Sequence, residues 1–76
     1  MKAKLEFNLP EERDEFTLAS NGGNFWSSLW DLDQWLRAKI KYGVDLEDYE
    51  IEIYEKIRDE LHQKMDENRV FLDMVE

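Results

Sequence analysis

The sequence of 76 residues has no cysteine, one histidine, one proline and three glycines. Without cysteine, neither a disulfide bond nor a thiolate metal site is possible, which fits a reducing compartment. No apolar run approaches the roughly 20 residues that a membrane-spanning helix requires, and the charged first residues do not resemble a signal peptide. We therefore expect a cytoplasmic protein that does not cross a membrane.

Basic residues are also few, because 10 Lys and Arg stand against 19 Asp and Glu, which gives a net charge of −9. Residues 1–42 carry six basic and seven acidic residues, whereas residues 43–76 carry four and twelve. This excess of negative charge argues against direct binding of nucleic acid or of an anionic membrane surface.

The remaining composition, 42% hydrophobic and 13% aromatic, is that of a chain that folds. A chain of this length forms one domain and buries only about 60% of the surface that it exposes when unfolded. We expect a mainly α protein, a compact three-helix domain with an extended N-terminal arm or short β-strand at residues 1–9.

The alternation of apolar and polar residues from Lys2 to Leu9 is typical of a half-buried strand, which needs a partner. Three arrangements are open. The segment could pair with the C-terminal tail (residues 69–76), where Val70–Val75 is the other strand candidate; it could pair with its own copy in a second subunit; or it could be an extended arm that packs on the helices.

Three helices are expected, at residues 10–20, 24–42 and 46–68. Asn8 and Pro10 favour the start of the first helix, and the glycines after Asn21 favour the end of that helix. Asn24 is the expected cap of the central helix, and Asp45 that of the third.

The central helix is apolar over nearly its whole circumference, with Trp26 and Trp30 on one flank and Trp35 on the other. The other two helices can cover two of its sides, and exposed apolar surface commonly marks an interaction site. Since tryptophan is enriched at binding hot spots, we expect these three residues to bind a partner or a second copy, unless the terminal segments fold over them.

No arrangement of residues favours catalysis. His62, with Asp59 and Asp66 one turn away on either side, could hold a metal, but a solvated helix face explains the same pattern better. Asp33 is expected to pair with Arg37, and the glycine-rich turn before Asn24 lacks the lysine of a phosphate-binding loop. We therefore predict no enzyme activity, no metal and no cofactor.

Two surfaces remain as candidates for binding. Acidic residues of the third helix, including Glu52, Glu55 and Asp59, form a row that could imitate nucleic-acid phosphates and bind a basic, nucleic-acid-binding protein. The alternative is an oligomer that binds a small ligand such as a nucleotide, with phosphate meeting the basic residues near the end of the central helix, Arg37, Lys39 and Lys41.

The stretches from Phe7 to Arg13, at Asn21-Gly22, and from Leu29 to Gly43 resemble small, acidic, largely uncharacterised proteins that tailed bacteriophages and prophages encode. The resemblance covers about the first 43 residues and contains no catalytic motif. It implies an accessory protein that works by binding in the host cytoplasm, as an inhibitor of a host or defence protein or as a helper of replication.

Overall fold

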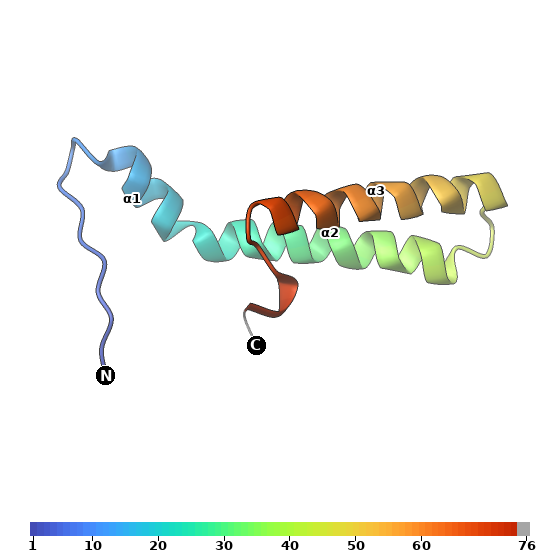
Figure 1. The fold of residues 1–76 in the computed structure, drawn as a ribbon, viewed down its shortest axis with the longest axis horizontal. Helices are drawn as coiled ribbons and strands as arrows, with labels where there is room; N and C mark the ends of the chain where they lie inside the picture. The colour runs from blue at the N-terminus through green and yellow to red at the C-terminus, as the bar shows by residue number, and fades with distance from the viewer. Residues whose placement is uncertain (75–76) are drawn as a thin grey trace.

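The computed structural model describes residues 1–74, which form three α-helices and a short 3-10 turn (Figure 1). Helix α1 spans Arg13–Ser20, α2 spans Gly22–Tyr42, α3 spans Asp48–Glu67, and the turn η1 spans Leu72–Met74. Helices α2 and α3 lie side by side as an antiparallel hairpin, and α1 extends α2 beyond the end of that hairpin (Figure 1).

The expectation of a compact domain is wrong, whereas the mainly α class is confirmed. The radius of gyration is 17.1 Å and the molecule measures 53 × 28 × 20 Å. A compact domain of this length has a radius of gyration of about 11 Å. The molecule is long because α1 packs on neither side of the hairpin, so that two helices, not three, form the packed unit.

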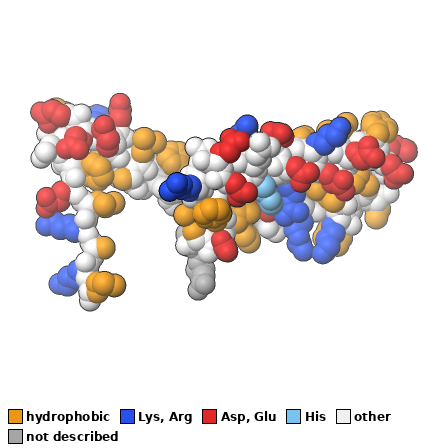
Figure 2. Space-filling view, viewed as in Figure 1, with side chains coloured by type: hydrophobic (Ala, Val, Ile, Leu, Met, Phe, Trp, Pro, Cys, Tyr) orange, Lys and Arg blue, Asp and Glu red, His pale blue; other side chains and the backbone are white. Residues whose placement is uncertain are grey.

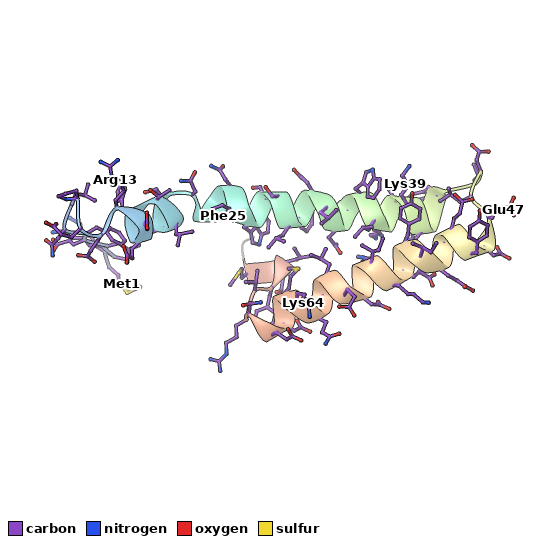
Figure 3. All side chains as sticks on the ribbon, turned by 90° about the horizontal axis from the view of Figure 1, so that it is seen from above. Met1, Arg13, Phe25, Lys39, Glu47 and Lys64 are labelled. Atoms are coloured by element: carbon purple, nitrogen blue, oxygen red, sulfur yellow. The ribbon has the colours of Figure 1, made fainter. Side chains whose placement is uncertain are left out.

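A heptad pattern on both helices of the hairpin explains their pairing. The residues that face the other helix, which we call the seam, recur at spacings of three and four. They are Trp26, Leu29, Asp33, Leu36 and Ile40 of α2, and Ile51, Tyr54, Arg58, Leu61 and Met65 of α3. These spacings place one stripe of each helix against the other, as in a coiled coil. Side chains of the two helices meet between them in Figure 3.

The connection between α1 and α2 differs from the expected glycine turn. Gly22 and Gly23 belong to α2, and Asn21 alone separates the two helices. The amide N–H of Asn21 donates to the Thr17 carbonyl at 3.1 Å, and the amide N–H of Phe25 donates to the Asn21 carbonyl at 3.0 Å. Helical hydrogen bonding thus continues across this junction, so the central helix begins before Asn24.

The other two helices, in contrast, begin later than expected. Helix α1 begins at Arg13, after a turn in which the Asn8 amide donates to the Glu12 carboxylate at 3.0 Å. Helix α3 begins after Glu47, whose amide N–H donates to the Glu50 side chain at 3.1 Å, and this bond replaces the expected cap at Asp45.

Neither terminal segment forms a strand within residues 1–74. The Phe7 ring of the N-terminal segment meets the Phe16 ring of α1 edge-on at a centroid distance of 5.8 Å. Residues 1–8 do not meet the C-terminal segment (Figure 1), so the predicted pairing of the termini is wrong for the described part of the chain. Val75, the last residue of the second strand candidate, lies outside the described residues. Pairing of the N-terminal segment with a second copy stays a prediction.

Candidate functional site

A polar cluster occupies the middle of the otherwise apolar seam. The Asp33 side chain is 2% exposed, and it accepts hydrogen bonds from Nε of Arg58 at 2.8 Å and from Nη2 of Arg58 at 3.2 Å. Nε2 of His62 lies 2.5 Å from the same carboxylate. The predicted partner of Asp33, Arg37, is therefore wrong, because Asp33 faces α3 and Arg37 does not.

This cluster has strong electrostatic consequences. Hydrogen bonds from Arg58 hold the pKa of Asp33 below its ordinary value of 3.8, with a smaller contribution from His62, and they outweigh the opposing effect of burial. The same hydrogen bonds raise the pKa of Arg58. A two-point pair between a carboxylate and a guanidinium has a defined geometry, so it can fix the register of the two helices.

The cluster does not have the composition of a metal site. Within residues 1–74, no group of three or more His, Asp and Glu side chains could hold a metal ion. His62 faces Asp33 and lies beside a guanidinium, which repels cations. No hydroxyl or amine nucleophile takes part in the hydrogen bonds of the cluster. The geometry is that of a structural polar pair inside a helical hairpin.

The two sides of the hairpin differ sharply in chemistry. On each helix, the residues that immediately precede seam residues lie on one side, and because the helices are antiparallel these two rows adjoin each other. The large apolar members of these rows, which we call the apolar flank, are Phe25, Leu32, Trp35, Ile53 and Ile57. Each of these five side chains is between 44% and 52% exposed.

Two contacts support this placement. The Trp35 ring meets the ring of Tyr54, a seam residue of α3, edge-on at a centroid distance of 5.6 Å. Nζ of Lys39 lies 5.4 Å from the centroid of the same indole. Trp35 and Lys39 therefore share the side of α2 that carries the apolar flank.

The residues that immediately follow seam residues form the opposite side, which also includes Trp30 and His62. We call its exposed members that carry a full charge the charged flank: Arg37 and Lys41 of α2, and Glu52, Glu55, Asp59 and Asp66 of α3. All six are exposed. Figure 2 shows acidic side chains along α3 and basic side chains below them, over α2. The three acidic residues predicted to bind a partner thus share one side, and none of them has an ion-pair partner within residues 1–74.

The structure divides the predicted tryptophan surface into two parts. The rings of Trp26 and Trp30 stack at a centroid distance of 5.7 Å, and the Trp26 indole N–H donates to the carbonyl of Phe71 at 3.4 Å. The C-terminal segment therefore partly covers these two residues, as one of the predictions allowed. Trp35 lies on the other side of the hairpin and has no such cover within residues 1–74.

The predicted ligand-binding residues are not brought together. Lys39 lies over Trp35 on the side of the apolar flank, whereas Arg37 and Lys41 belong to the charged flank. A phosphate at one of these positions could not meet all three side chains. A hollow of about 280 Å³ beside His62 of the polar cluster lies between α3 and η1, and its lining includes Asp66 and Asp73, which suits an anion poorly.

Sequence reasoning missed the exposed position of Ile53 and Ile57 beside the seam and the pairing of Asp33 with Arg58. The heptad spacing of both helices was the available signal, because it places Asp33 and Arg58 at seam positions. No helix within residues 1–74 is long and apolar enough to cross a membrane. No family model, curated protein or solved structure matches the chain.

Proposed function

We propose that the protein is a protein-interaction module that works by binding another polypeptide through the apolar flank and not by catalysis. The observation that carries this proposal is the exposure of Phe25, Leu32, Trp35, Ile53 and Ile57 along one side of a paired hairpin. Within residues 1–74, Leu36 and Met65 are the sole buried apolar side chains. Contiguous exposed apolar patches on soluble proteins mark interaction surfaces.

The arrangement of these side chains also suits binding. Trp35 is held by Tyr54 beneath it and Lys39 beside it, so it presents a fixed aromatic surface with little loss of side-chain entropy on binding. Rigid aromatic residues surrounded by smaller apolar side chains are typical of binding hot spots. The resemblance to phage accessory proteins favours inhibition of a host or defence protein as the outcome of such binding.

Matched variants test the proposal. Leu32→Glu places a charge in the apolar flank, whereas Ser27→Glu places the same charge at an exposed position on the other side of α2. Tagged forms of both variants and of the unmodified chain are used for affinity capture from bacteria that also express the untagged chain. We expect at least one protein to be captured by the unmodified chain and by Ser27→Glu but not by Leu32→Glu. Equal capture by all three would contradict the proposal.

A further inference from the structure

The sequence of each hairpin helix contains apolar residues for two neighbours, but the chain supplies one. In α2, the seam faces α3, and Phe25, Leu32 and Trp35 form a second apolar row beside it. In α3, Ile53 and Ile57 continue this row on the same side of the hairpin. A helix with apolar residues at the seam and along one adjoining row is the pattern of a four-helix bundle, in which each helix packs on two others.

The accessible surface of the chain is larger than that of a compact monomer of the same mass. The accessible surface is 6783 Å². A compact monomer of 9.2 kDa exposes about 4,900 Å², so this chain exposes roughly 1,900 Å² more than its mass requires. Subunits of stable dimers bury about 800 Å² each in standard interfaces and more than 1,000 Å² in obligate ones. Residues 1–20 contain no buried residue and contribute part of this excess, and the half-exposed side chains of the apolar flank contribute another part.

The charges around the apolar flank permit two copies to approach. The rows that contain the flank also hold two lysines and two glutamates, Lys39 and Lys64 with Glu50 and Glu60, so their charges cancel. The acidic residues Glu52, Glu55 and Asp59 lie on the opposite side and would point away from the contact. A chain with a net charge of −9 therefore presents a neutral, apolar side to its copy.

From these three observations we infer that the occupant of the apolar flank is a second copy of this chain, and that two hairpins pack face to face as a four-helix bundle. The contact is isologous, with the same residues on both subunits, which closes the assembly at two copies. Leu32, Trp35 and Ile57 then become core residues, and the charged flanks form the outer surface of the dimer. This inference rests on the proposed function, since it names the partner of the same surface.

The test measures the mass and the stability of the full chain in solution. We expect sedimentation equilibrium to give twice the chain mass of 9.2 kDa for the unmodified protein and for Ser27→Glu. Because folding is coupled to association in such a dimer, its melting temperature should rise with protein concentration. Leu32→Glu should shift the mass to that of one chain or abolish the helical signal in circular dichroism.

Each other outcome overturns the inference. A folded chain of single mass, with a melting temperature independent of concentration, would exclude the second copy. The proposed function would survive that result if a different protein were still captured in a Leu32-dependent way. A dimer whose mass and melting temperature are the same in Leu32→Glu and Ser27→Glu would place the contact elsewhere, and it would remove the support for both proposals.

Discussion

Asp33 of α2 and Arg58 of α3, which are 25 positions apart in the sequence, form the polar centre of the hairpin through two hydrogen bonds of 2.8 and 3.2 Å. Apolar seam residues lie on both sides of this pair along each helix. A shift of one helix by a turn would place the Asp33 carboxylate against an apolar side chain and leave its charge unpaired. The pair thereby favours one register of α2 on α3 over its neighbours.

Removal of the Arg58 side chain should therefore lower the stability of the hairpin strongly. Arg58→Ala leaves the nearly fully buried Asp33 carboxylate with His62 and a long hydrogen bond of 3.4 Å from the Gln34 amide, and poorly compensated buried charges of this kind cost about 3–5 kcal/mol. Since small domains have a free energy of unfolding of only about 5–15 kcal/mol, urea denaturation should show most of the stability lost.

Two further variants show whether this loss of stability comes from the pair of Asp33 and Arg58. His62→Ala should cost less than Arg58→Ala, because the His62 side chain is 45% exposed and Arg58 still compensates the carboxylate. The double variant Asp33→Leu/Arg58→Leu should recover stability relative to Arg58→Ala, because it removes both charges. Equal losses in Arg58→Ala and His62→Ala would contradict the account of the cluster.

The lowered pKa of Asp33 predicts a specific dependence on acid. Its pKa lies below 3.8 in the folded protein, so the carboxylate contributes stability above pH 3.8 that is lost as the pH falls through the folded value. Unfolding free energies of the unmodified chain and of Asp33→Asn, measured by denaturation from neutral pH downward, should converge in that acidic range. A difference that stays constant below pH 3.8 would contradict the prediction.

Gly43, at the end of α2, should not tolerate a side chain. A Cβ atom at this position would overlap the Lys39 carbonyl oxygen and Cδ1 of Leu46, and the backbone oxygen cannot move without opening the last turn of α2. We expect Gly43→Ala to lower the free energy of unfolding by about 1–3 kcal/mol, the usual cost of overpacking. Gly23→Ala is the control, because no atom lies within 4 Å of its Cβ position; thermal denaturation should show it to be at least as stable as the parent.

Reversal of the acidic row should leave self-association intact. Glu52, Glu55 and Asp59 belong to the charged flank, away from the proposed contact between copies. The triple variant with lysine at these positions should sediment with the same mass as the unmodified chain. A triple variant that dissociates while it remains helical would show that the charged flank, and not the apolar flank, joins the copies.

The helical class and the approximate extent of α2 and α3 were predictable, because periodicity and caps are local properties of the sequence. The pairing of Asp33 with Arg58 was not, because Arg37 is also one turn away and local reasoning favours the nearer partner. The prediction of a compact domain was wrong for a related reason. The apolar pattern of α1, with Phe16 and few other large residues, does not say whether α1 folds back on the hairpin, and Asn21 alone is too short a connection for that reversal.

The tryptophans show the same division between local and long-range information. The helical spacing placed Trp35 apart from Trp26 and Trp30, as the structure has it. Trp26 donates a hydrogen bond to the carbonyl of Phe71 because of the way the chain turns after α3. No periodic pattern in the sequence specifies that turn.

The central claim is that the apolar flank is covered when the protein functions, and Trp35 reports on it directly. In a Trp26→Phe/Trp30→Phe chain, Trp35 is the sole tryptophan, and it is 51% exposed in the isolated hairpin. We predict that acrylamide quenches its fluorescence weakly at micromolar protein concentration, and that adding Leu32→Glu, but not Ser27→Glu, restores strong quenching. Equally strong quenching in all three chains, with their helical signal intact, would show that the flank is open to solvent in the purified protein and would contradict its pairing with a second copy.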